Sequence, residues 1–117
     1  MINLDGKRAL VCGGTSGIGE ASAEALRECG ADVVVLSRSA SGKNTISCDL
    51  EDLESLTDLI KKEISSNGSF DILINNSGGP PSGPLIDAKP SDFEKAFLRH
   101  VLASQTLVQL LLPGMES

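Results

Sequence analysis

The stretch that decides the fold reads Lys7-Arg8-Ala9-Leu10-Val11-Cys12-Gly13-Gly14-Thr15-Ser16-Gly17-Ile18-Gly19. Its first part, Arg8 to Cys12, is a short apolar run that predicts a strand buried on both faces. Its second part has the spacing G-x-x-x-G-x-G and comes directly before a predicted helix. A turn this tight needs residues without Cβ, and a phosphate can approach the backbone only where side chains are absent. The free N–H groups of the helix N-terminus complete a predicted phosphate site.

The glycine spacing leaves an alternative open, because a plain glycine-rich turn between a strand and a helix could show the same pattern. The spacing is not the G-x-G-x-x-G of other dinucleotide folds. It is not a P-loop either, since no Gly-Lys-Ser/Thr ends it. Its place between a strand and a helix favours phosphate binding.

The rest of the chain alternates between strand-like and helix-like segments. Further strands are predicted at residues 32–36, 44–48 and 71–75, and helices after Gly19, at about 53–65 and at about 91–112. This order predicts an α/β fold, a Rossmann-type doubly wound parallel sheet with helices on its faces, in one dinucleotide-binding domain over residues 1–117. Ligands of such folds bind at the carboxyl ends of the strands.

Two of the helices are predicted in more detail. The first should end at Gly30, and its apolar stripe is expected at Ile18, Ser22, Ala25, Leu26 and Cys29. Ser91 is expected to cap the last helix, with Glu94 completing a capping box. Its apolar side is expected at Phe93, Phe97, His100, Ser104, Leu107, Val108 and Leu111.

Composition excludes several classes of function. The net charge of −6 argues against nucleic acid or an anionic membrane as partner, so any anionic ligand must be held by a local site. Cys12, Cys29 and Cys48 lack metal-ligand spacing, which predicts buried thiols and no metal site. The start of the chain has no apolar signal region and no apolar run is long enough for a membrane span, so we expect a soluble, cytoplasmic protein.

The stretch from Lys7 to Gly19 resembles the opening of the short-chain dehydrogenase/reductase family, including its 3-oxoacyl-ACP-reductase-like and glucose-dehydrogenase-like members. Cys12 stands where the family usually has threonine. The resemblance implies that Gly13, Gly17 and Gly19 shape the turn, and that Thr15, Ser16 and Ile18 contact the pyrophosphate and nearby ribose. It covers essentially the whole chain, but only about the first half of a family member.

The end of the second strand, Ser37-Arg38-Ser39, bears on the choice of dinucleotide. NAD binders tend to place an acid here, whereas residues 37 to 43 contain none. A guanidinium can grip a 2′-phosphate with two hydrogen bonds, so NADP(H) is preferred over NAD(H), with Arg38 as the main contact and Ser37 and Ser39 assisting. Alternatively, Arg38 is a surface residue and both cofactors are accepted. Lys43 adds charge or is a solvated loop residue.

Two further motifs match the family. Cys48-Asp49-Leu50 resembles its adenine-binding segment, in which the carboxylate meets the adenine amino group. Asp49 could otherwise cap the following helix, or do both. Asn75-Asn76-Ser77-Gly78 resembles the family's Asn-Asn-Ala-Gly, and implies that Asn76, Ser77 and Gly78 lie against the cofactor ribose. Small residues suit a place where the chain passes close to a ligand.

The catalytic residues of the family are largely missing. His100 stands where the family usually has an asparagine that supports a proton relay, and it could take a comparable place. The alternative is a half-buried histidine beside Phe97. The chain has no tyrosine, and Lys95 is its last lysine, so the family's Tyr-x-x-x-Lys cannot be present. A fifth strand is expected after the last helix, so we expect a fragment with an uncovered fourth strand that is inactive alone.

The resemblance implies an oxidoreductase that moves hydride between NADP(H) and a small carbonyl compound or secondary alcohol, with this chain as its cofactor-binding half. Family members commonly pair through the last helix present here, so a homo-oligomer is expected. The alternative is a non-catalytic dinucleotide-binding or interaction module. A methyltransferase that uses S-adenosylmethionine is disfavoured, because no acid ends the second strand.

Overall fold

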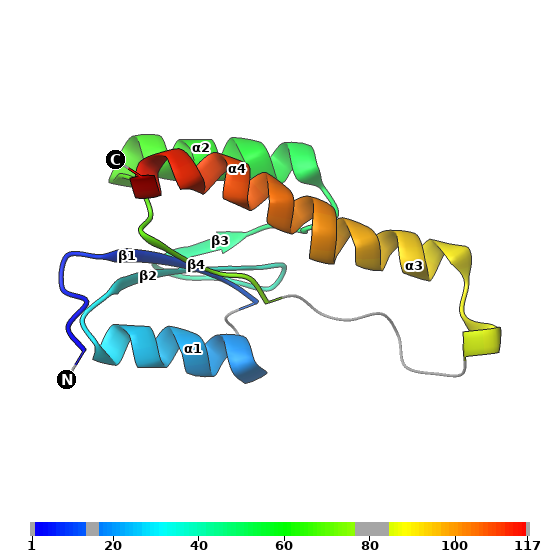
Figure 1. Ribbon diagram of the computed structural model, residues 1–117, viewed down its shortest axis with the longest axis horizontal. Coiled ribbons are helices and arrows are strands. Elements are labelled where there is room, and N and C mark those ends of the chain that lie inside the picture. The colour runs from blue at the N-terminus through cyan, green and yellow to red at the C-terminus, as the bar shows by residue number, and fades with distance from the viewer. Residues whose placement is uncertain (1, 14–16, 77–84, 117) are drawn as a thin grey trace.

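The structure is a computed structural model that describes residues 2–13, 17–76 and 85–116. Within these residues the chain forms a parallel sheet between two layers of helices (Figure 1). The strands lie in the order β3-β2-β1-β4. Their bounds are β1 (Arg8–Cys12), β2 (Asp32–Ser37), β3 (Thr45–Ser47) and β4 (Ile72–Ile74). The predicted parallel sheet is confirmed, with the outer strands shorter than predicted.

The helices cover both faces of this sheet. On one face lies α1 (Gly17–Glu28), and on the other lie α2 (Leu53–Asn67) and α4 (Ala103–Glu116) (Figure 1). Between β4 and α4 the chain forms a short 3₁₀ turn, η1 (Leu85–Asp87), then α3 (Pro90–Phe97) and a π-helical turn, η2 (Leu98–Leu102). α3 continues the line of α4 and projects past the sheet.

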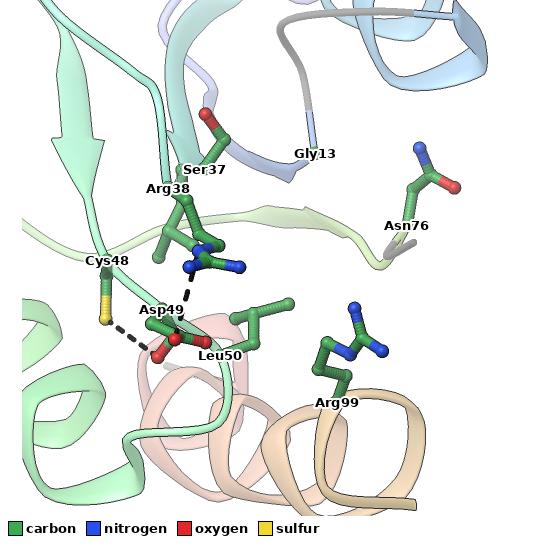
Figure 2. A pocket seen from close by; sticks show the side chains of 9 residues that line it. Gly13, Ser37, Arg38, Cys48, Asp49, Leu50, Asn76 and Arg99 are labelled. Atoms are coloured by element: carbon green, nitrogen blue, oxygen red, sulfur yellow. Dashed lines mark hydrogen bonds and ion pairs between the residues drawn. The ribbon is translucent and has the colours of Figure 1, made fainter. Parts of the chain in front are cut away.

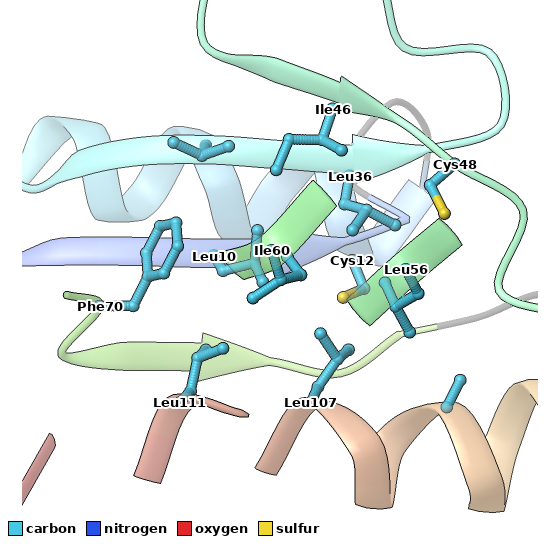
Figure 3. Packing of buried hydrophobic residues seen from close by; sticks show 12 residues of the cluster. Leu10, Cys12, Leu36, Ile46, Cys48, Leu56, Ile60, Phe70, Leu107 and Leu111 are labelled. Atoms are coloured by element: carbon cyan, nitrogen blue, oxygen red, sulfur yellow. The ribbon is translucent and has the colours of Figure 1, made fainter. Parts of the chain in front are cut away.

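The central strands divide their side chains between the two helical layers. Successive residues of a strand point to opposite faces, so a continuous apolar run can be buried on both. Ala9 and Val11 pack toward α1, whereas Leu10 and Cys12 pack into the layer under α2 and α4. β2 repeats this alternation in register beside β1. Figure 3 shows the second layer, which is completed by Leu56, Ile60, Phe70, Leu107 and Leu111.

The predicted apolar stripe of the first helix holds at Ser22, Leu26 and Cys29, which are partly buried, and is wrong at its other two positions. Ile18 is 76% exposed and Ala25 is also exposed, whereas Gly19 and Ala23 are buried against the sheet. The reason is the close approach at Gly19, where an added Cβ would lie 2.0 Å from the carbonyl oxygen of Gly13. Small residues decide which face of α1 meets the sheet, and the hydrophobicity of Ile18 does not.

The details predicted for the last helix also need correction. Lys89 is the N-cap and Pro90 takes the first helical position, where a missing N–H costs nothing, so Ser91 lies inside the helix. Asp92, not Glu94, returns a hydrogen bond to the cap, accepting from the Lys89 N–H. The helix continues past Leu112 to Glu116.

The predicted inner side of the last helix holds only in its second part. Leu107 and Leu111 are buried, as is Ala103, which the prediction missed. Phe93 and Phe97 are each 53% exposed, and Val108 and His100 are exposed as well. Two features explain the difference: α3 projects past the sheet, and η2 interrupts the regular helical repeat between α3 and α4.

The buried thiols give a prediction about pH. Burial, with a smaller contribution from Cys48, raises the pKa of the Cys12 thiol from 9.0 to about 12. The unfolded chain therefore loses this proton near pH 9 while the folded chain keeps it, and the free energy of unfolding should fall as pH rises from about 9 to 12. Chemical denaturation at pH 8, 9 and 10 measures this fall.

The same burial predicts which thiol reacts. In the folded chain at pH 8, Ellman's reagent should modify the partly exposed Cys29 first, and Cys12 only after unfolding. Equal reaction rates for Cys12 and Cys29 in the folded chain would contradict the placement of Cys12 in the core.

Candidate functional site

The sheet topology places a crevice between β1 and β4. The chain moves outward from β1 to β2 and β3, then returns to the other side of β1 to form β4. The connections that follow β1 and β4 therefore leave in opposite directions, and ligands of open α/β sheets bind where the strand order reverses in this way. Gly13 directly follows β1, and Asn76 lies two residues beyond β4.

A cavity of about 220 Å³ opens at this end of the sheet (Figure 2). It brings together residues from the glycine turn, from the ends of β2, β3 and β4, and from η2. Its described lining consists of Gly13, Leu36, Ser37, Arg38, Cys48, Asp49, Leu50, Asn76 and Arg99. Four segments that the sequence singled out separately thus meet at one place.

The glycines of the turn are required by close backbone contacts. Gly13 has φ +71°, and an added Cβ there would lie 2.6 Å from the carbonyl oxygen of Asn76. At Gly19 an added Cβ would meet the Gly13 carbonyl, and it would lie 3.0 Å from the Asn76 amide nitrogen. The turn after β1, the start of α1 and the end of β4 are therefore packed backbone to backbone, and the wall they share at Gly13 carries no side chain.

The end of β2 supplies polar groups. The Ser37 hydroxyl is buried, and it has no hydrogen-bond partner among the described residues. Buried hydroxyls usually find a partner, so this one suits a polar ligand. The Arg38 side chain is 73% exposed, and its Nε lies 3.9 Å from a carboxylate oxygen of Asp49. A pair this long and this exposed adds little stability, so Arg38 can exchange Asp49 for a more strongly charged partner.

Asp49 is held on the far side of that pair. Its Oδ1 accepts a hydrogen bond of 2.9 Å from the Glu51 backbone N–H. The alternative that Asp49 caps the following helix is wrong, because the N-cap of α2 is Asp52, which accepts from the Ser55 N–H. Asp49 therefore keeps its other oxygen for Arg38 or for a ligand.

Several other residues expected at the site do not line this cavity, and their contacts with a cofactor stay predictions. Ile18 and Ser39 are exposed and do not line the cavity, and neither does Lys43. His100 is also exposed and outside the lining, so the alternative of a half-buried histidine beside Phe97 is wrong; its proposed place in a proton relay stays a prediction. Gly17 has φ +58° and leads into α1. The expectations for Thr15, Ser16, Ser77 and Gly78 fall outside the described residues.

Sequence reasoning missed Arg99. Its side chain is 21% exposed and lines the cavity from the helix side. A regular α-helix would place His100 on the inner side. The π-helical turn η2 contains both Arg99 and His100 and interrupts that regular repeat. The sequence did contain an indication of its role. Arg99 lies next to the predicted inner side of a helix, where a guanidinium needs an anionic or polar partner.

The lining fits the adenosine half of a dinucleotide. The cavity is smaller than the roughly 300–1,000 Å³ of a whole small-molecule site, so it suits one part of a larger ligand. Its described lining holds two arginines, Arg38 and Arg99, in a chain of net charge −6, each at ion-pair distance from one carboxylate. Hydroxyl, carboxylate and amide groups are spaced around an apolar floor that includes Leu36 and Leu50.

The comparison with protein families decides the identity of the fold. A family model described as short chain dehydrogenase matches residues 7–117. The chain belongs to the short-chain dehydrogenase family. Among curated proteins, this short-chain dehydrogenase chain is 33% identical over 129 aligned residues to 7alpha-hydroxysteroid dehydrogenase of Escherichia coli strain K12, covering 98% of this chain and 50% of the relative. It spans about half the length of the curated relatives it matches.

Solved structures with the same fold agree with this assignment. The chain matches L-sorbose reductase from Gluconobacter frateurii, complexed with NADPH and L-sorbose, with a TM-score of 0.83 at 28% identity, covering 97% of this chain and 49% of the reductase. It matches a blue fluorescent protein from a metagenomic library, in complex with NADPH, with a TM-score of 0.85 at 31% identity, covering 97% and 53%. The Rossmann-type fold is therefore that of the family.

Two features are absent from the described part of the chain. None of its helices has both the length and the apolar character needed to cross a membrane. The same residues contain no group of three or more histidine, cysteine, aspartate or glutamate side chains placed to hold a metal ion.

Proposed function

We propose that this chain binds NADP(H) in preference to NAD(H), as the cofactor-binding half of an oxidoreductase that acts on a carbonyl compound or a secondary alcohol. The observation that supports this most is the cavity in which the glycine turn, Ser37, Arg38 and Asp49 meet. NADPH in two solved relatives adds support for the phosphorylated dinucleotide.

Each group of the cavity has a task in this proposal. Gly13 leaves room for the dinucleotide backbone beside the N-terminus of α1, whose dipole favours phosphate. Ser37 and Arg38 hold the 2′-phosphate, the guanidinium by paired hydrogen bonds. Asp49 accepts from the adenine amino group, and Asn76 lies toward the ribose. The nicotinamide ring, when bound, supplies or accepts the hydride, and these residues bind and orient the molecule that carries it.

A second candidate function is binding without catalysis. The chain contains no tyrosine, and no lysine follows Lys95. We therefore propose that this chain alone binds the dinucleotide and does not oxidise or reduce substrate. Absence of NADPH oxidation with a panel of carbonyl compounds, together with measurable NADPH binding, is the expected result.

The binding proposal is tested by titrating the chain with NADPH, NADH and S-adenosylmethionine in separate calorimetric experiments. NADPH is expected to bind at least tenfold more tightly than NADH, and S-adenosylmethionine to bind least. Equal affinity for the two dinucleotides would leave a dinucleotide site without the proposed preference. Tighter binding of S-adenosylmethionine than of either would overturn the assignment.

We also propose that the chain self-associates through its last helices. Phe93, Phe97, Val101, Val108 and Leu112 are between 44% and 53% exposed along α3, η2 and α4. A run of exposed apolar side chains is typical of an interaction surface. Replacing Phe93 and Phe97 by lysine should lower the mass measured by light scattering, whereas lysine at the exposed Ala25 should not. An unchanged mass would contradict this surface as the contact.

A further inference from the structure

The π-helical turn η2 sets the orientation of Arg99. Across this turn the backbone N–H of Ala103 bonds to the carbonyl of Leu98, five residues back, in place of the usual four. Such turns are rare within helices and frequently occur at functional sites. Here two neighbours differ sharply: Arg99 is 21% exposed and lines the cavity, whereas His100 is exposed outside it. The turn thus directs a long cationic side chain toward the crevice.

The Arg99 guanidinium is incompletely satisfied by the chain. Its Nε is buried and has no hydrogen-bond partner among the described residues. The carboxylate of Glu51 lies 3.8 Å from this Nε, which is an ion-pair distance but too long for a hydrogen bond. Leaving a buried charged donor without an acceptor is costly, so such a group usually belongs to a binding site or contacts water.

The position of Arg99 differs from that of the other arginine. Figure 2 shows Arg99 rising from its helix beside Leu50 toward Asn76, while Arg38 and Asp49 lie on the other side of Leu50. A ligand with its 2′-phosphate at Arg38 would therefore turn its base and ribose toward Arg99. The base, and the ribose apart from its 2′ substituent, are the same in NADP(H) and NAD(H).

We propose that Arg99 is a binding residue for the adenosine part of the dinucleotide. Its Nε–H donates to an acceptor on the ribose, and its planar guanidinium stacks on the base, an arrangement that arginine favours with flat π-systems. Glu51 lies at ion-pair distance from the Nε without accepting its hydrogen bond, so the proposed contacts of Arg99 with the ligand do not depend on it. This inference rests on the proposed dinucleotide site and adds to it a residue that acts on affinity, not on the choice of cofactor.

The test compares three variants of the chain with the wild type by calorimetric titration with NADPH and with NADH. Arg99→Met removes the charge and the donor but keeps an unbranched apolar stem. It should weaken the binding of both dinucleotides about tenfold, with the ratio of their affinities unchanged. Arg99→Lys keeps the positive charge but lacks the planar guanidinium. It should therefore show most of the loss of affinity seen in Arg99→Met. Glu51→Gln removes the ion pair and should leave both affinities within about twofold.

Several results would overturn the role of Arg99. Wild-type affinity in Arg99→Met would do so, and so would full rescue by lysine. An equal loss of dinucleotide affinity in Glu51→Gln and Arg99→Met would show that Arg99 acts only through its ion pair with Glu51, as part of the structure. Circular dichroism and melting temperatures of the ligand-free variants confirm that losses are not due to unfolding. If the wild-type chain binds neither dinucleotide, the proposed function itself is wrong. If Arg38→Ala selectively loses affinity for NADPH while Arg99→Met binds both dinucleotides like wild type, only the role of Arg99 is wrong.

Discussion

Gly19→Ala should abolish measurable dinucleotide binding and lower the free energy of unfolding by about 1–3 kcal/mol. The added methyl group would lie 2.0 Å from the Gly13 carbonyl oxygen and 3.0 Å from the Asn76 amide nitrogen. Both neighbours are fixed, one as backbone and one by its place beside β4. α1 must therefore move away from the sheet, and the turn that forms one wall of the cavity must move with it. Urea denaturation and NADPH titration measure the two effects.

The control for this variant is Gly42→Ala. Gly42 has φ +95° in the loop after β2, and an added Cβ there would meet nothing within 4 Å. This change should cost stability through backbone strain alone, and it should leave NADPH binding close to wild type. Wild-type NADPH affinity in Gly19→Ala would contradict the close packing of the turn as a requirement for the site.

Arg38→Ala should weaken NADPH binding about 10- to 100-fold and NADH binding no more than about twofold. A hydrogen bond to a charged group contributes about 1.5–3 kcal/mol, which corresponds to this range. The selectivity follows because only NADPH carries the 2′-phosphate. The pair with Asp49, at 3.9 Å and largely exposed, is too weak for its loss to unfold the chain. Parallel titrations with both dinucleotides at low and high salt measure the effect.

Lys43→Ala is the matched control for Arg38→Ala. Lys43 is an exposed cation on the same loop that does not line the cavity, so its removal changes the overall charge equally without touching the site. It should change NADPH affinity less than threefold. An equal loss of NADPH and NADH affinity in Arg38→Ala would contradict the assignment of Arg38 to the 2′-phosphate.

Much of the fold follows from local patterns in the sequence. Arg8–Cys12 and Asp32–Ser37 are short apolar runs, which suit only a strand covered on both faces, and the structure distributes their side chains between two layers. A parallel sheet then brings the strand ends together. That is why Gly13, Ser37, Asp49 and Asn76, far apart in sequence, could be expected at one crevice.

The predictions that were wrong concern features set by contacts between segments that are far apart in the sequence. The exposure of Ile18 at the start of α1 could not be predicted from hydrophobicity, because the close backbone approach of Gly19 to Gly13 determines which residues there face the sheet. Arg99 was missed because a single π-helical turn changes which residue faces the sheet, and no pattern in the sequence marks that turn. Both errors concern helix rotation, which tertiary packing sets.

We propose that the cavity at the carboxyl ends of β1 and β2 holds the adenosine half of NADP(H). The most direct measurement is a ¹⁵N–¹H correlation spectrum of the chain titrated with 2′,5′-ADP, which carries that half alone. We expect saturable shifts in the backbone amides of Gly13, Ser37, Arg38 and Leu50, with little change in α2 beyond Leu56. Shifts confined to other residues, or none at millimolar ligand, would contradict it.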